Sequence, residues 1–176
     1  MLKNNQFDSV FINIVAGKFA IKTDKSDPEA IMRINKKGEE VYERHYSIIQ
    51  GKIVRLEHEK TEFGDYLSVK IKSDKIYIFK IPAYSRLENG FLQRLPNVDL
   101  EKEVEIGLYT PENTTYLYMR QDGIISTAFS KEEIPKFKEI TLRGKKGFDP
   151  EPAFTYLYEK ALKPAQQKLN TEDLPF

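Results

Sequence analysis

Alternation of apolar and polar residues between positions 10 and 129 limits this chain to a mainly β fold. A period of two places one face of each strand on a core and the other face in solvent. The strand-like runs are 10–23, 31–36, 41–60, 66–73, 76–83, 104–110 and 115–129. Turn signals such as Lys37-Gly38 and Asp122-Gly123 separate them, so we expect most connections to be hairpins.

Two intervals have helical spacing instead. In residues 85–100, four apolar residues recur at near-helical intervals before Pro96, which predicts a short helix. Residues 153–169 predict a second helix, with Asp149 as its N-cap, and Pro164 should kink or end it. Its apolar face either packs on the strands or contacts another copy of the chain, which would make a homo-oligomer.

The order of these elements suggests a fold. From Tyr46 onward it is a long strand, two hairpin-linked strands, a helix and two further strands, as in an OB-fold. Another small β-barrel or a sandwich is the alternative. We expect an N-terminal β extension (1–45), an OB-fold-like five-stranded barrel (46–130), a basic loop with a C-terminal helix (131–169) and an acidic tail (170–176).

Composition excludes several kinds of chemistry. The chain has no cysteine and only two histidines, His45 and His58, so we expect neither a disulfide framework nor a metal site. Walker, dinucleotide, nucleophile-elbow and zinc-deaminase signatures are lacking, which predicts a protein without a cofactor that is not an enzyme. No apolar run approaches the roughly 20 residues that span a bilayer, and we expect a soluble, cytoplasmic protein that does not bind membranes.

Charge is distributed unevenly along a chain whose net charge is only +1. Residues 47–86 carry an excess of Lys and Arg, whereas residues 87–113 carry an excess of Asp and Glu. Such segregation is usual for differently solvated faces, and a groove that binds a polyanion on one side also requires it. The acidic residues Glu101, Glu103 and Glu105 should then face away from a polyanion.

The last residues carry the most specific motif of the sequence: Glu172, Asp173, Leu174, Pro175 and Phe176. They resemble the acidic tip of bacterial and phage single-stranded-DNA-binding proteins, which ends in acidic residues, an aliphatic residue, proline and phenylalanine. A phenylalanine that bears a carboxylate can fill an apolar pocket beside a basic side chain. The long Gly/Gln/Pro-rich linker and the tryptophans of the bacterial proteins are missing, so the phage-encoded proteins are more similar.

This resemblance implies a function. Proteins of this family coat single-stranded DNA during replication, recombination or repair, and they recruit the proteins of these processes through the tip. The chain would then work in the cytoplasm of a bacterium or of a phage-infected host. A structural or interaction protein, such as a phage assembly component, and an RNA-binding OB module are the alternatives.

Alternation also selects candidate DNA-binding residues. With Leu67, Val69 and Ile71 on the core side of one strand, the tyrosine and lysines between them share the other side, and Leu117 and Met119 similarly leave their neighbours outside. Tyrosines stack on bases while Lys and Arg neutralise phosphates, although each could equally be sheet surface or core. The candidates are Tyr66, Lys70, Lys72, Tyr77, Tyr116, Tyr118, Arg120, Lys52 and Arg55. Arg143, Lys145 and Lys146 in the basic loop could follow the phosphate backbone.

Overall fold

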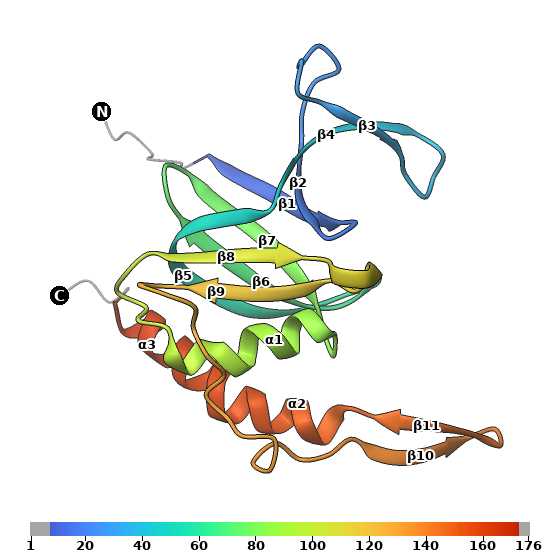
Figure 1. The fold of residues 1–176 in the computed structure, drawn as a ribbon, viewed down its shortest axis with the longest axis vertical. Helices are drawn as coiled ribbons and strands as arrows, with labels where there is room; N and C mark the ends of the chain where they lie inside the picture. Colours follow the sequence, from blue (N-terminus) through green and yellow to red (C-terminus); the bar gives the residue numbers. More distant parts are fainter. Residues whose placement is uncertain (1–7, 173–176) are drawn as a thin grey trace.

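A computed structural model describes residues 8–172 and shows a mainly β protein with helices at its C-terminal end (Figure 1). The strands are β1 (Ser9–Val15), β2 (Lys18–Lys22), β3 (Ile31–Ile34), β4 (Glu40–Tyr46), β5 (Ile48–Thr61), β6 (Gly64–Lys72), β7 (Ile76–Pro82), β8 (Val104–Tyr109), β9 (Tyr116–Arg120), β10 (Lys138–Leu142) and β11 (Lys145–Asp149). The helices are α1 (Arg86–Arg94), α2 (Glu151–Leu157) and α3 (Lys163–Glu172), with a π-helix (Tyr158–Leu162) between the last two.

Nine strands form one sheet in the order β3-β4-β2-β1-β7-β6-β5-β8-β9. The five strands expected to make a barrel, β5 to β9, are therefore part of a larger sheet. β7 pairs with β1 in parallel, and within residues 8–172 the edge strand β9 has β8 as its one neighbouring strand. The mainly β class and the C-terminal helix are confirmed, but the sheet is not a closed barrel.

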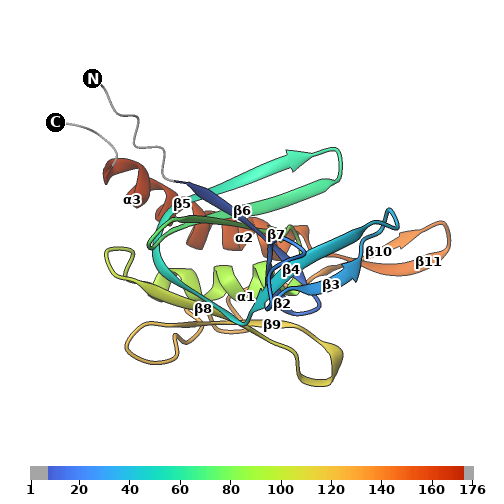
Figure 2. The ribbon, with the colours of Figure 1, turned by 90° about the horizontal axis from the view of Figure 1, so that it is seen from above.

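The long strand β5 belongs to both halves of this sheet. Its first four residues pair with β8, and later residues, from Lys52 to Thr61, pair with β6, with a register shift between Ile53 and Arg55. A Cβ atom at Gly51 would lie 2.5 Å from the carbonyl oxygen of Lys72, so only glycine allows β6 to approach so closely. β5 thus bends around the core, and Figure 2 shows β5 and β6 on one side of α1 with β8 and β9 on the other.

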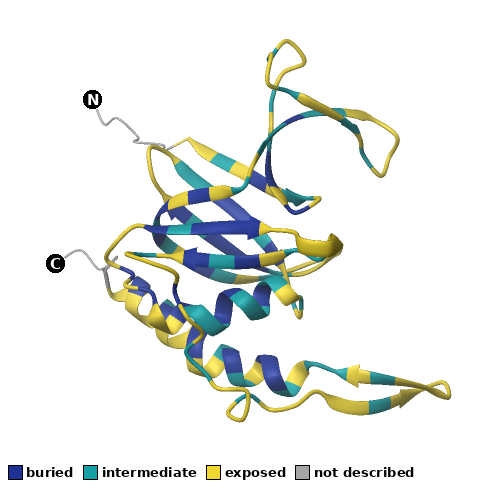
Figure 3. Ribbon diagram, in the orientation of Figure 1, coloured by how far each residue is buried: buried dark blue, intermediate teal, exposed yellow. Residues whose placement is uncertain are grey.

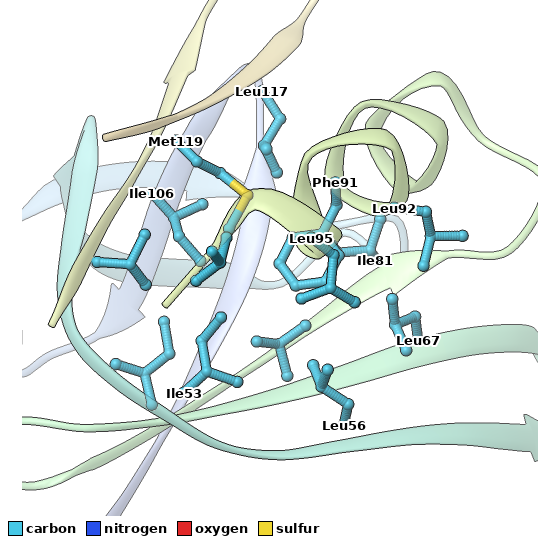
Figure 4. Close-up of a cluster of buried hydrophobic side chains, with 14 of the residues drawn as sticks. Ile53, Leu56, Leu67, Ile81, Phe91, Leu92, Leu95, Ile106, Leu117 and Met119 are labelled. Carbon is cyan, nitrogen blue, oxygen red and sulfur yellow. The ribbon is translucent and has the colours of Figure 1, made fainter. Parts of the chain in front are cut away.

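The core lies between these two halves and is closed by α1. Figure 4 shows Phe91 and Leu92 of α1 among buried side chains from β5 to β9. The predicted inward residues are buried: Leu67, Val69, Ile71 and Met119 are fully inaccessible, and Leu117 is nearly so. Ser85 caps α1 by accepting a hydrogen bond from the amide of Glu88 at 3.1 Å. Pro96 lies in the 3-10 turn that follows α1, as expected.

The C-terminal helices pack on α1 and β5, and Glu88 joins the two parts. This carboxylate is fully buried. The hydroxyl of Tyr158 donates to both of its oxygens at 3.1 Å, and His58 Nε2 lies 3.2 Å from Oε1. Burial among these groups raises the pKa of Tyr158. Both histidines thus form hydrogen bonds with carboxylates: His58 with Glu88, and His45 with Glu43.

Several boundaries differ from those expected. The run 10–23 contains two strands joined at Ala16-Gly17, the run 41–60 divides at Ser47, and the last run ends at Arg120. The helical segment does not end at Pro164, because the π-helix widens the turn before the ring, where an α-helix would have clashed with it. Asp149 still accepts a hydrogen bond from the Glu151 amide at 3.0 Å, although it ends β11.

Two hairpins extend from this body (Figure 1). One consists of β3 and the outer part of β4, where Arg33 forms two hydrogen bonds, of 2.7 and 2.8 Å, with the buried carboxylate of Glu43. The other is β10–β11, in the segment expected to be a basic loop. Within residues 8–172 no helix is long and apolar enough to cross a membrane.

Candidate nucleic-acid interface

The first candidate surface is the outer face of β5, β6, β7 and β1, opposite the core. Strand pairing places Phe11 beside Ile78, Ile78 beside Lys70, and Lys70 beside Arg55, which makes one row across the four strands. The adjacent row joins Lys72 of β6 to Lys52 of β5. Five candidates from the sequence therefore share this face: Tyr66, Lys70, Lys72, Lys52 and Arg55.

Three aromatic rings surround a hollow on this face. The hollow has a volume of about 400 Å³, and its lining includes Phe11, Phe63, Tyr66, Ile78 and Lys80. Phe11 is 68% exposed and Phe63 is 83% exposed, so their rings are open to solvent. The Tyr66 hydroxyl donates to the carbonyl oxygen of Phe63 at 3.3 Å, which holds the strand and its turn together.

Sequence reasoning missed Phe11 and left Phe63 out of the binding set. Phe63 does lie in a recognisable turn, and an exposed aromatic residue there was a usable signal. Phe11 lies on this face because β1 pairs in parallel with β7, more than 60 residues away in the chain. Nothing local in the sequence indicates that pairing.

Carboxylates accompany the cations of this face. Glu57 lies 2.7 Å from Arg55 and 3.8 Å from Lys70, and Glu59 forms an ion pair with Lys80. The hydrogen bond from Lys80 holds the pKa of Glu59 below its ordinary value. Lys52 likewise lies 3.1 Å from Glu101. With five cations and two carboxylates on its strands, the face keeps a positive balance: Lys52, Arg55, Lys70, Lys72 and Lys80 against Glu57 and Glu59.

The second candidate surface is the outer face of β8 and β9, where Tyr116, Tyr118 and Arg120 point away from the core. Tyr109, which the sequence reasoning did not select, stacks on Tyr116 with ring centroids 5.4 Å apart and lies 6.1 Å from Tyr118. The Arg86 guanidinium lies 5.3 Å from the Tyr116 ring, and that of Arg120 lies 5.9 Å from the Tyr118 ring. These rings therefore already contact one another or an arginine.

The Tyr118 ring lies over the backbone of β8. A Cβ atom at Gly107 would be 2.1 Å from Tyr118 Cζ, so this glycine makes room for the ring. Burial is the main cause that raises the pKa of the Tyr118 hydroxyl. Glu105 lies 3.8 Å from Arg120, so a carboxylate accompanies the cation. Glu105 thus shares a face with the three candidates Tyr116, Tyr118 and Arg120, contrary to the expected separation of the acidic segment.

The nine candidates do not form one surface. The inner faces of both strand groups contact the same core, so their outer faces point away from each other, as the arrangement in Figure 2 indicates. Tyr77 belongs to neither group. It shares the inner face with Phe79, donates a hydrogen bond to Asp74 at 2.9 Å and lines a pocket of about 240 Å³ beside Tyr46 and Ile48. Burial is the main cause that raises its pKa.

The candidate partner-binding residues Asp173, Leu174, Pro175 and Phe176 lie outside the described residues, as does the side chain of Glu172. In residues 8–172, no group of three or more His, Asp or Glu side chains is arranged to hold a metal ion. Comparisons with models of known protein families, with curated protein sequences and with solved structures find no match to this chain.

Proposed function

We propose that this protein binds single-stranded DNA on the outer face of β5, β6, β7 and β1. The observation that carries the proposal is the hollow lined by the rings of Phe11, Phe63 and Tyr66, beside rows of Lys and Arg side chains. Unpaired bases stack on such rings, at about 1–3 kcal/mol per base, while the cations neutralise phosphates. The binding has weak sequence preference, because every base has a π-face.

The order of elements supports this choice of face. The series β5, β6, β7, α1, β8 and β9 follows the order of an OB-fold, in which the middle strands and neighbouring loops bind oligonucleotides. In this proposal β1 takes the place beside β7 at which a five-stranded barrel would close, and it adds Phe11 to the face. The face on β8 and β9 has no comparable role, because its rings stack on one another and on arginines.

The proposal includes recruitment of replication, recombination or repair proteins through Asp173–Phe176, for which the sequence motif is the support. Deletion of Leu174–Phe176 should leave the affinity for single-stranded DNA intact, or increase it if the acidic segment competes for the cations. Recovery of such proteins with the immobilised protein should be lost. Equal recovery with and without these residues would remove this part of the proposal and leave DNA binding untouched.

A fluorescence titration tests the main proposal. Labelled oligo-dT, the matching duplex and oligo-U are titrated with the protein at two salt concentrations. We expect oligo-dT to bind most tightly, and its affinity to fall with salt at a log–log slope of about −0.7 per phosphate neutralised. Equal affinity for oligo-dT and duplex, or binding of neither at low salt, would refute the proposal, and preference for oligo-U would assign the face to RNA.

A further inference from the structure

The β10–β11 hairpin is an arm that the proposed binding face does not include. It projects beyond α2, and nearly all of its residues are exposed (Figures 1 and 3). A two-stranded hairpin is marginal on its own, and this one has little core to hold it. Leu142 and Phe148 remain 68% and 65% exposed, respectively. Its surface therefore contributes little to the folding of the body.

The charges of this arm differ from those of the sheet. Residues 136–149 contain five cations and two acids: Lys136, Lys138, Arg143, Lys145 and Lys146 against Glu139 and Asp149. Within the part of the chain that the structure describes, none of these five cations forms an ion pair. On the sheet face, by contrast, Arg55, Lys70 and Lys80 each face a carboxylate. A polyanion that meets the hairpin need not displace a carboxylate first.

The turn of the hairpin places its cations at the tip. Arg143 and Gly144 have φ values of 50° and 76°, so the backbone turns in the left-handed region, where asparagine and glycine are favoured. An arginine at the first of these positions costs conformational energy that asparagine would spare. Lys145 and Lys146 follow directly. Lys146 also shares a face with the exposed ring of Phe148, since both alternate with Gly147.

We infer that the β10–β11 hairpin is a second contact for nucleic acid, in which Arg143, Lys145 and Lys146 bind backbone phosphates. The inference rests on the proposed function, which supplies the nucleic acid. The sheet face stacks on the bases and neutralises phosphates with its own cations, and the hairpin increases the electrostatic part of the affinity through further charges. The phosphates belong either to the bound single strand or to duplex that flanks it.

A triple substitution tests this inference. Arg143→Gln, Lys145→Gln and Lys146→Gln together should lower the affinity for oligo-dT at low salt and reduce the magnitude of the salt slope by up to about 2, at about 0.7 for each lost contact. The matched control is Lys160→Gln, Lys163→Gln and Lys168→Gln, which removes the same charge from exposed positions on the C-terminal helices. Its slope should remain that of the wild type.

Both triple variants are titrated with oligo-dT and with oligo-dT that carries a duplex at one end. A reduced slope on oligo-dT itself assigns the contact to the single strand, and a reduced slope only with the flanking duplex assigns it to the duplex. Unchanged slopes on both, or equal reductions in the control, would overturn the inference while the proposed function stands. A wild type that binds neither substrate would instead refute the proposed function. Thermal unfolding of the hairpin variant should match the wild type, because the three side chains are exposed.

Discussion

The two outer faces of the sheet contain similar residues in different arrangements. Each combines aromatic rings with Lys or Arg. On β8 and β9, Tyr109 and Tyr116 stack on each other and two arginines lie over tyrosine rings. On β5, β6, β7 and β1, the rings of Phe11 and Phe63 are open beside a hollow. Composition is therefore a poor guide to a stacking surface, and the number of ring faces left free is a better one.

Removal of two of the rings that line the hollow should have the largest effect. Phe63→Ala together with Tyr66→Ala should weaken oligo-dT binding by about 1–3 kcal/mol per lost stack, because each ring offers a face to one base. The matched control is Tyr109→Ala with Tyr116→Ala, which removes two rings from the opposite face. Fluorescence titrations of both variants at one salt concentration measure the difference. Equal losses would show that the two faces are not distinct in function.

A substitution on the outer face of β8 and β9 should instead change the stability of the protein. Gly107→Ala introduces a methyl group where the Tyr118 ring lies, so the ring must move and the protein should lose about 1–3 kcal/mol of unfolding free energy. Oligo-dT affinity should not change. Urea unfolding measures the cost, and the same substitution in a Tyr118→Ala background should cost much less, because the clash is gone. A full cost in that background would place the strain elsewhere.

Substitution of a carboxylate on the outer face of β5, β6, β7 and β1 should have a smaller effect on DNA affinity. Glu57→Gln frees Arg55 and Lys70 for phosphates, so oligo-dT should bind more tightly by up to about 1 kcal/mol at low salt. The gain should disappear as salt screens the charges. Glu105→Gln, which frees Arg120 on the opposite face, is the control and should leave the affinity unchanged. A gain from the control alone would move the binding site to β8 and β9.

The local sequence pattern determines which residues of the site could be predicted. Leu67 and Met119 were placed correctly because each alternates with polar or aromatic neighbours, so the period alone shows which side faces the core. Tyr77 lies between Ile76 and Ile78, and a run without polar residues gives no such information. Its inner position follows from pairing with β6.

The pairing of strands that are distant in the chain could not be predicted from the sequence. The bend of β5 at Gly51 sends Tyr66 and Tyr118 to opposite sides of the core, although their strands show the same local pattern. The β10–β11 hairpin was expected as a loop because its strands are short and rich in lysine, which weakens the apolar alternation. The order of elements could be predicted because it depends on local signals. The pairing of distant strands depends on the completed core.

The smallest and most specific effect should be a pH dependence of oligo-dT affinity that arises from the ion pair between Glu59 and Lys80. The pKa of this carboxyl is lowered from 4.5, chiefly by the hydrogen bond from Lys80, so the ion pair stabilises the fold above that pH and is lost as the pH falls through the lowered value. Glu59 therefore still neutralises Lys80 at pH 4.5, and Lys80 becomes free for phosphates only in more acid solution. Glu59→Gln should bind oligo-dT somewhat more tightly than the wild type near neutral pH. The two affinities should converge only below pH 4.5.

Oligo-dT suits this measurement because thymine does not take up a proton in this range, so the change comes from the protein. The comparison between wild type and Glu59→Gln cancels pH effects that the two proteins share. Glu105→Gln serves again as the control for the opposite face, and its difference from the wild type should stay constant across the pH range. Convergence of wild type and Glu59→Gln well above pH 4.5 would contradict the ion pair with Lys80 and, with it, the placement of that lysine beside the hollow.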